Sequence, residues 1–184
     1  MNEGPADLAR AVIQFWCEEL APELHWKKDP AMDQHIAERF GKVRDEVLRT
    51  KAADWRGTPE TLAAAIILLD QFSRNMFRGK ARAFEADSLA LELSKLALER
   101  GWLDKLPKPL PSFMLMPLQH SENLEDQERS VAEFRKLDDA EGLRYAILHR
   151  DQIRRFGRFP GRNRALGRVS TPEEREVIER GETF

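Results

Sequence analysis

Leu62–Leu69 reads LAAAIILL and is the longest apolar run in the chain. A helix that is apolar around almost its whole circumference is typical of the centre of a core. Thr58 and Pro59 predict where this helix begins, because a Thr cap followed by Pro at the first helical position is typical of helix N-termini. The run is far shorter than the roughly 20 residues that span a bilayer. We therefore expect a central helix in which three side chains are almost fully buried: Ile66, Leu69 and Phe72.

On both sides of this run, apolar side chains recur at the three- and four-residue spacing of amphipathic helices. No Asn-Gly or Asp-Gly pair and no alternating run of strand-forming residues occurs, so hairpins are not expected. The predicted class is all-α, with about seven or eight helices in one domain over 1–184 and no β-sheet. The expected helices are Ala6–Leu20, the segment from the Asp29 cap to Arg49, the central helix up to Gly79, Ala81–Arg100, a short turn at Phe113–Leu118 that Pro117 stops, Glu122–Leu137 after a Ser121 cap, Asp139–Arg155 and a short helix capped at Thr171. Residues 105–111 should form an extended connector.

The charges of the chain are nearly balanced, with 30 Lys and Arg against 32 Asp and Glu and a net charge of −2 over 184 residues. This balance disfavours a basic nucleic-acid binder and a polybasic membrane-surface protein. Met1–Pro5 lacks the basic start of a secretory signal, and the single cysteine, Cys17, rules out an internal disulfide and a cysteine-cluster metal site. The sequence therefore predicts a cytoplasmic protein with no cofactor, no nucleic-acid partner and no membrane association.

A polar stripe follows the apolar run directly, in the sequence DQFSRNMFRG at 70–79. Asp70, Arg74 and Arg78 are four residues apart and share one helix face, and Asn75 lies on the adjacent face. Polar side chains beside a buried helix need partners or line a cavity. Guanidinium groups bind carboxylates and phosphates bidentately, so these four residues are candidate ligand-binding residues. The alternative is a structural network in which Asp70 pairs with Arg74.

The segment 150–168 contains seven arginines and one acidic residue, for a local balance of +6. Glycine and proline shape its second half, and two phenylalanines would hold its backbone. We expect this loop to present arginines to a phosphate or carboxylate, with an asparagine that orients the anion by hydrogen bonds. The alternative is neutralisation by residues 119–142, whose balance is −5. The candidate residues of the loop are Arg158, Arg162, Asn163 and Arg168.

His120 and Glu122 lie at a predicted helix start and are not explained by helix capping. An imidazole and a carboxylate at such a place are candidates for a general acid/base pair or for two positions of a metal site. The alternative is that His120 is a packing residue and Glu122 favours the helix dipole. The spacing from His120 to His149 fits no local metal motif.

Four segments carry a resemblance to a known family: WKKDPAMD at 26–33, DQFSRNMFRG at 70–79, MPLQHSENLEDQERSV at 116–131 and RFGRFPGRNRALGR at 155–168. Together they resemble the bacterial family called domain of unknown function 924, over nearly the whole chain. The resemblance implies an all-α, tetratricopeptide-like curved layer of paired helices and no established activity. Gly161 stands where members of that family often have His, so we expect no tightly bound transition metal.

These patterns lead to three hypotheses. The first is binding of a small anionic ligand in one cleft shared by the three polar motifs, with His120 and Glu122 supplying any acid/base chemistry. The second is a tetratricopeptide-like scaffold whose arginines clamp an acidic peptide. The third, RNA binding through the arginine-rich segment, is the weakest because the chain is net acidic and its aromatic residues have core-like spacing.

Overall fold

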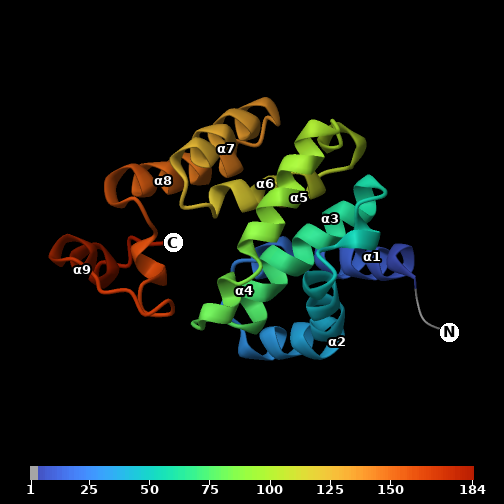
Figure 1. Ribbon diagram of the computed structural model, residues 1–184, viewed down its shortest axis with the longest axis horizontal. Coiled ribbons are helices and arrows are strands. Elements are labelled where there is room, and N and C mark those ends of the chain that lie inside the picture. Colours follow the sequence, from blue (N-terminus) through green and yellow to red (C-terminus); the bar gives the residue numbers. More distant parts are fainter. Residues whose placement is uncertain (1–3) are drawn as a thin grey trace. The chain divides into compact units, whose positions relative to one another are not determined.

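The computed structural model describes residues 4–184, which form helices and connecting turns without a strand in this range (Figure 1). A π-helical turn at Leu68–Phe72 joins α3 to α4 in one continuous rod, so the described chain contains eight helical rods. The predicted all-α class is confirmed. The α-helices are α1 (Pro5–Gln14), α2 (Pro30–Arg49), α3 (Pro59–Ile67), α4 (Ser73–Met76), α5 (Asp87–Glu99), α6 (Leu110–Gln119), α7 (Leu124–Lys136), α8 (Ala140–Phe156) and α9 (Pro172–Glu179).

The chain forms two compact units. Of the described residues, the N-terminal unit contains 4–78 and Arg82–Pro117, and the C-terminal unit contains Gly79–Ala81 and Leu118–Phe184. The single domain over 1–184 and the tetratricopeptide-like curvature stay predictions. Among the residues that the structure describes, no helix has both the length and the apolar composition needed to cross a membrane.

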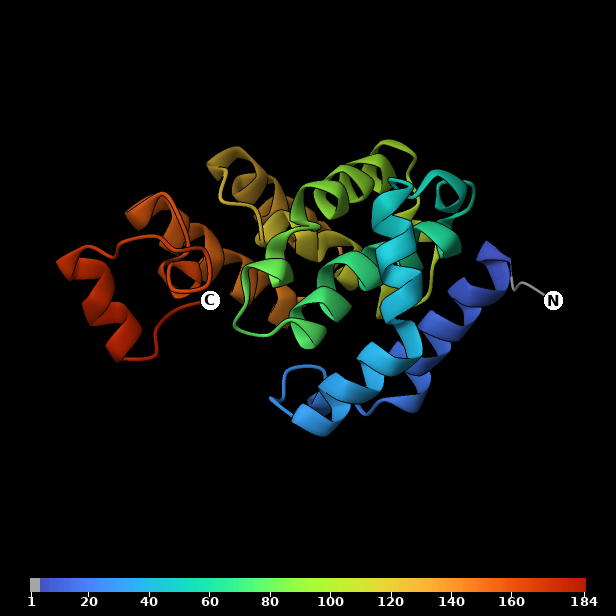
Figure 2. The ribbon, with the colours of Figure 1, turned by 60° about the horizontal axis from the view of Figure 1, so that its bottom comes forward.

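The rod that begins with α3 is the centre of the N-terminal unit, and α1, α2 and α5 pack around it (Figures 1 and 2). Thr58 caps the rod, because its side chain accepts a hydrogen bond from the Thr61 N–H while the Thr61 hydroxyl accepts one from the Thr58 N–H. Every side chain from Leu62 to Leu69 is 0% exposed, and so is Phe72. The prediction of a buried central helix is therefore confirmed at Ile66, Leu69 and Phe72.

Two π-helical turns meet in this core. One follows α1 at Phe15–Glu19, and the other is the Leu68–Phe72 turn of the rod. The ring centroids of Phe15 and Phe72 are 6.0 Å apart, and those of Trp16 and Phe72 are 5.3 Å apart. A π-helical turn is a local change in the helical repeat that is frequent at functional sites. Here it holds two buried polar residues, Asp70 and Gln71.

Helices α5 and α6 begin at residues that differ from the prediction. Ala81–Phe84 is a short 3-10 turn and α5 begins at Asp87, so one helix over Ala81–Arg100 is wrong at its start. Helix α6 begins at Leu110, inside the predicted extended connector, and continues through Pro117. Pro117 removes one backbone donor but lies in the last turn of α6. Burial of apolar side chains on this helix offsets the lost hydrogen bond, and the fully buried ones are Met114, Leu115 and Leu118.

In the C-terminal unit, α7 and α8 pack against each other and a long turn connects α8 to α9 (Figure 2). The predicted Ser121 cap of α7 is wrong, because the Asn123 side chain accepts hydrogen bonds from two backbone N–H groups of that helix. The Ser121 hydroxyl instead accepts from the Asn123 N–H and donates to Asp126, which shapes the turn before the helix. The predicted cap at Thr171 is confirmed, and α8, which was expected to begin at Asp139, is capped by the side chain of that residue.

Candidate functional site

The turn between α8 and α9, residues 157–171, is named the arginine loop here. It binds the carboxylate of Glu174 from the first turn of α9. Arg158 donates to this carboxylate through Nε at 2.7 Å and Nη2 at 2.8 Å, Asn163 Nδ2 donates at 3.2 Å and the Thr171 N–H donates at 2.8 Å. Glu174 is only 2% exposed. The hydrogen bond from Arg158, together with those from Thr171 and Asn163, outweighs burial and lowers the pKa of Glu174 to about 2.

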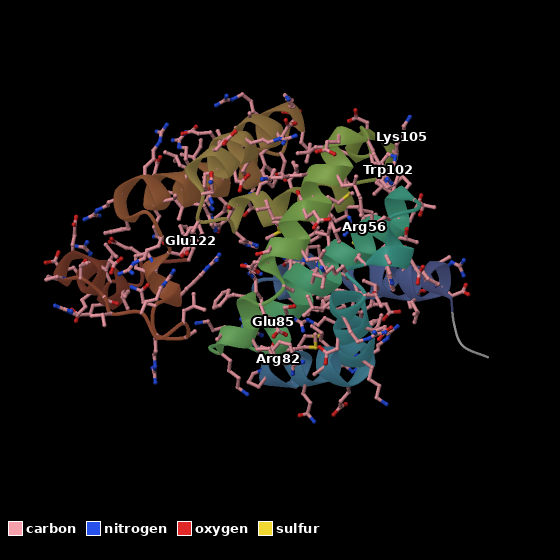
Figure 3. All side chains as sticks on the ribbon, in the orientation of Figure 1. Arg56, Arg82, Glu85, Trp102, Lys105 and Glu122 are labelled. Carbon is pink, nitrogen blue, oxygen red and sulfur yellow. The ribbon has the colours of Figure 1, made fainter. Side chains whose placement is uncertain are left out.

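The arginine loop binds a second carboxylate, that of Glu122, from the turn before α7 (Figure 3). Arg168 donates to it through Nη1 at 2.7 Å and Nη2 at 2.9 Å, and the Phe159 N–H donates to Oε1 at 2.7 Å. Burial alone raises the pKa of Glu122, but the hydrogen bonds from Arg168 and Phe159 outweigh it and hold that pKa below its usual value. Glu122 is therefore ionised at neutral pH, and its side chain is still 29% exposed.

Asn163 connects the two carboxylate sites. Its Oδ1 accepts a hydrogen bond from Arg168 Nε at 2.9 Å, and its Nδ2 donates to Glu174 and to Ser170 Oγ. A continuous chain of hydrogen bonds thus runs from Glu122 through Arg168 and Asn163 to Glu174. Networks of this kind hold their members in one arrangement, so the arginine loop holds these two carboxylates of the chain in fixed positions.

Arg162 and two histidines lie beside this network. Arg162 donates from Nη2 to the His120 backbone carbonyl at 2.9 Å, and its guanidinium lies 4.4 Å from the centroid of the Phe159 ring. The rings of His120 and His149 have centroids 6.1 Å apart. His149 Nδ1 lies 2.8 Å from the Tyr145 carbonyl oxygen, which can only accept, so this ring nitrogen carries the proton.

In the N-terminal unit, the second half of the polar stripe binds a carboxylate from α2. Arg78 donates to Asp33 through Nε and Nη2, both at 2.9 Å, and Asn75 Nδ2 donates to the same carboxylate at 2.9 Å. Burial of Asp33 raises its pKa, but the hydrogen bonds from Arg78 and Asn75 outweigh burial and lower the pKa below its usual value.

The first half of the stripe forms an ion pair inside the rod. Arg74 Nη1 lies 3.0 Å from Asp70 Oδ1, and the same guanidinium donates to both oxygens of Asp87 at 2.9 Å and 3.0 Å. Asp70 is 1% exposed. The structural alternative for this stripe, an Asp70–Arg74 pair, is therefore present in the molecule.

A further arginine cluster of the N-terminal unit is centred on Arg44, which is fully buried on α2. Its Nε donates to Ser73 Oγ at 2.9 Å, and its Nη1 donates to Asp45 at 2.9 Å and Glu85 at 2.6 Å. Arg82 binds the same two carboxylates, and Figure 3 shows it beside Glu85. These ion pairs connect the 3-10 turn before α5 to α2. Asp45 and Glu85 are the carboxylates that pair with both arginines.

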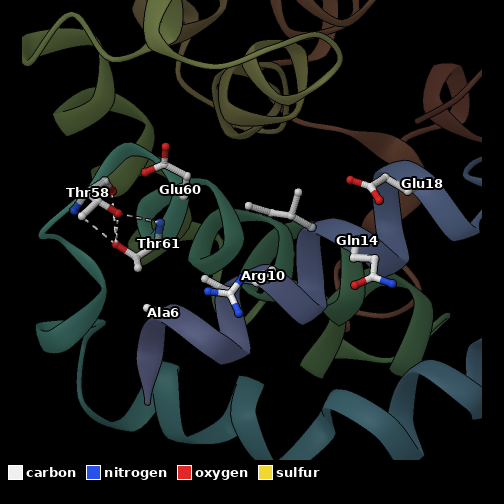
Figure 4. Close-up of a pocket in the computed structure, with 9 residues that line it drawn as sticks. Ala6, Arg10, Gln14, Glu18, Thr58, Glu60 and Thr61 are labelled. Carbon is white, nitrogen blue, oxygen red and sulfur yellow. Dashed lines mark hydrogen bonds between the residues drawn. The ribbon is translucent and has the colours of Figure 1, made fainter. Parts of the chain in front are cut away.

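A hollow of about 490 Å³ lies between α1 and the start of α3 (Figure 4). Several of its polar side chains are used locally: Thr58 and Thr61 bond each other in the helix cap, and Arg10 pairs with Asp7. Gln14, Glu18 and Glu60 also line the hollow, and Gln14 donates to Glu19. Within residues 4–184, no three His, Cys, Asp or Glu side chains are arranged to hold a metal ion, and the absence of a tightly bound metal stays a prediction.

The structure thus places the predicted site residues in two groups. His120, Glu122, Arg158, Arg162 and Asn163 lie together in the C-terminal unit around the arginine loop. The polar stripe belongs to the N-terminal unit. Asp70, Arg74 and Asn75 lie on the rod, whereas Arg78 lies in the turn after the rod ends at Met76, so the prediction that this helix continues to Gly79 is wrong at its end. A cleft shared by both groups stays a prediction.

Sequence reasoning missed the acids that pair with these arginines. Asp33, Asp87 and Glu174 are partners of Arg78, Arg74 and Arg158. One signal was available for Glu174, because it is the fourth residue of the capping box that Thr171 opens. Asp33 lies 45 residues before Arg78, and its one sequence signal is its place at the end of the motif WKKDPAMD at 26–33.

The described residues define an all-helical protein in which arginines of the polar stripe and of the arginine loop bind carboxylates of the chain itself. The comparisons with known proteins bear on its family and its fold. Residues 12–182 match the model of a family described as bacterial protein of unknown function (DUF924). The chain therefore belongs to this family, as the resemblance of its motifs implied.

A solved structure from Agrobacterium tumefaciens, described as a protein of unknown function, is similar to this chain. The two are 36% identical, the match covers 96% of this chain and 99% of that chain, and the TM-score is 0.90. No curated protein matches the chain. The comparisons thus agree with the all-α fold and assign no activity.

Proposed function

We propose that the protein binds a small anionic molecule, a carboxylate or a phosphate, at the arginine loop in the place that Glu122 occupies. The observation that carries this proposal is the three-donor cradle of Arg168 and the Phe159 N–H around a partly exposed carboxylate. Hydrogen bonds to charged groups contribute about 1.5–3 kcal/mol each, and a ligand oxygen can form the same ones. Glu122 is then the internal anion that the ligand replaces.

Glu122 is better suited to leave its site than Glu174. Glu174 is buried, accepts from four donors and closes the cap of α9. Glu122 lies in a turn outside any helix, and the backbone of that turn is held independently. Gln127 Nε2 donates to the Gln119 and Ser121 carbonyls, both at 2.6 Å. The Glu122 side chain therefore leaves by rotation of its own bonds, without unfolding the turn.

The surroundings favour an anion with more than one negative charge. The charge of Arg162 contributes to lowering the pKa of Glu122, so it acts at the same position as Arg168. A phosphate gains from both guanidinium groups, whereas a single carboxylate has only one negative charge to offer. We therefore expect phosphate-containing or polycarboxylate ligands to bind more tightly than acetate.

The predicted catalytic roles of His120 and Glu122 stay predictions. A carboxylate that Arg168 keeps ionised is a poor general acid at neutral pH, because it has no proton to give. The proposal is therefore one of binding, and its ligand class agrees with the partner predicted from the sequence. The alternative hypothesis is a scaffold that clamps an acidic peptide, and it requires a long ligand. The proposed site at Arg168 requires only a small anion such as inorganic phosphate.

Calorimetric titration with inorganic phosphate tests this function. We expect the native protein to bind phosphate and Arg168→Gln to bind it at least tenfold more weakly, since one lost charge-assisted contact is worth about 1.5–3 kcal/mol. Arg164→Gln is the matched control, because Arg164 is an exposed arginine of the same loop, and it should bind as the native protein does. Native protein that binds no anion, or Arg168→Gln that binds phosphate normally, would contradict the proposal.

A further inference from the structure

The hollow of the N-terminal unit follows one face of α1 and of the π-helical turn after it. Four of its lining residues are spaced four apart along this face: Ala6, Arg10, Gln14 and Glu18. A helix rises about 1.5 Å per residue, so the face from Ala6 to Glu18 is about 18 Å long. Glu60, in the first turn of α3, lines the opposite wall. The hollow is therefore elongated and suits a linear ligand.

The floor of the hollow is apolar and its rim is polar. Ala9 is 1% exposed and Ile13 is half-buried, whereas Gln14, Glu18 and Glu60 are exposed. Ligand pockets measure roughly 300–1,000 Å³, and the volume of about 490 Å³ lies within this range. A ligand in the hollow can thus cover an aliphatic chain against Ala9 and Ile13 and keep its polar ends at the rim.

The two glutamates lie at opposite ends of the hollow. Figure 4 shows Glu60 at the α3 end and Glu18 at the far end, with Arg10 between them. Within the described part of the chain, neither of these carboxylates belongs to an ion pair or a hydrogen bond. The charge of Arg10 is offset by Asp7, whose carboxylate lies 3.3 Å from the Arg10 guanidinium. The glutamates therefore give the hollow two uncompensated negative charges, one at each end.

From this arrangement we infer that the hollow binds a linear aliphatic polyamine. One terminal ammonium group pairs with Glu18 and the other with Glu60, and the methylene chain between them lies over Ala9 and Ile13. The Gln14 side chain donates to Glu19 through Nε2, and its amide oxygen is an acceptor on the rim for an inner amino group. A single metal ion does not fit this site, because one ion cannot reach carboxylates at both ends.

Calorimetric titration with spermidine at low salt tests the site. We expect the native protein to bind spermidine, and Glu18→Gln and Glu60→Gln each to bind it about fivefold more weakly, because an exposed ion pair is worth at most about 1 kcal/mol. The losses should multiply in the double variant, since the two carboxylates act on separate ends of the ligand. Native protein that does not bind spermidine, or a double variant that binds it within twofold of the native protein, would overturn the inference.

Two control variants show whether the loss belongs to this hollow. Glu179→Gln removes an exposed glutamate of α9, and Arg168→Gln alters the proposed anion site, so both should bind spermidine as the native protein does. Ala6→Lys adds an ammonium group at the edge of the hollow and should weaken binding about fivefold in a protein with an unchanged circular dichroism spectrum. A loss for Glu179→Gln equal to that for Glu18→Gln would show non-specific attraction and would contradict the site.

The need for two charged ends is tested with n-butylamine, which has one ammonium group. It can pair with only one of the two carboxylates, so we expect the native protein to bind it at least fivefold more weakly than spermidine. Raising the salt concentration should weaken spermidine binding, because the glutamates are exposed and their charges are screened. Equal affinity for n-butylamine and spermidine would contradict a ligand that spans the hollow.

Discussion

Arg74→Met is expected to lower the free energy of unfolding by about 3–5 kcal/mol, because it removes one partner of a buried ion pair. Asp70 lies inside the π-helical turn of the central rod and is 1% exposed, so its carboxylate has little access to water. Arg74 also binds Asp87 with two hydrogen bonds, which ties the rod to α5. The measurement is chemical denaturation followed by circular dichroism at neutral pH.

Arg78→Met is the matched control for this substitution. Arg78 lies four residues after Arg74, in the turn beyond α4, and also binds a carboxylate, but its side chain is 38% exposed against 20% for Arg74. Exposed ion pairs contribute about 0–1 kcal/mol, so we expect a loss within that range. Equal losses for both variants, or a loss below about 1 kcal/mol for Arg74→Met, would contradict a structural role for the Asp70–Arg74 pair.

Glu174→Gln is expected to lower the free energy of unfolding at pH 7 by about 3 kcal/mol. The pKa of Glu174 is about 2 in the folded protein against a reference value of 4.5, so the folded state favours the ionised form. Stability from this group is therefore fully present above the unfolded pKa of 4.5 and is lost as the pH falls from there towards 2. Denaturation curves between pH 7 and pH 2.5 measure both quantities.

The pH dependence separates this effect from simple loss of packing. Between pH 4.5 and pH 2.5 the native protein should lose stability more steeply than Glu174→Gln, because the glutamine cannot take up a proton. Glu173→Gln is the control, since Glu173 is the exposed neighbour that pairs with Arg155. Parallel stability curves for Glu174→Gln and the native protein in the acid range would contradict the account of this carboxylate.

Much of the fold was predictable because its signals are local. Thr58 with Pro59, Asp29 with Pro30 and the Thr171 box each mark a helix start within a few residues, and all three are helix caps in the structure. The apolar run predicted the central rod for the same reason. The predicted helix start was wrong where two neighbouring residues could both cap the same helix. At α7 both Ser121 and Asn123 can do so, and in the structure Asn123 supplies the cap.

The candidate site was predictable only in part, because ion pairing depends on contacts distant in sequence. Arginine-rich segments stand out, but the acids that bind them do not: Glu122 lies 46 residues before Arg168 and Asp33 lies 45 residues before Arg78. Local charge balance indicated an anion site at the arginine loop. The tertiary structure shows that two anions of the chain itself, Glu122 and Glu174, are bound there.

Occupation by an internal carboxylate has a consequence for affinity. A ligand that enters the cradle of Arg168 must first displace Glu122, and the free energy of that ion pair is subtracted from the free energy of ligand binding. Removing the Glu122 carboxylate should therefore strengthen binding, whereas removal of a carboxylate unrelated to the site should not. This gain in affinity is specific to the replacement of Glu122 by ligand.

The most direct test is calorimetric titration of Glu122→Ala with inorganic phosphate, beside the native protein and Glu173→Gln. The account predicts that Glu122→Ala binds phosphate at least tenfold more tightly than the native protein, which corresponds to about 1.4 kcal/mol. Glu173→Gln should bind as the native protein does. Phosphate affinity that is unchanged or weaker in a folded Glu122→Ala protein would contradict the claim that Glu122 occupies the anion site.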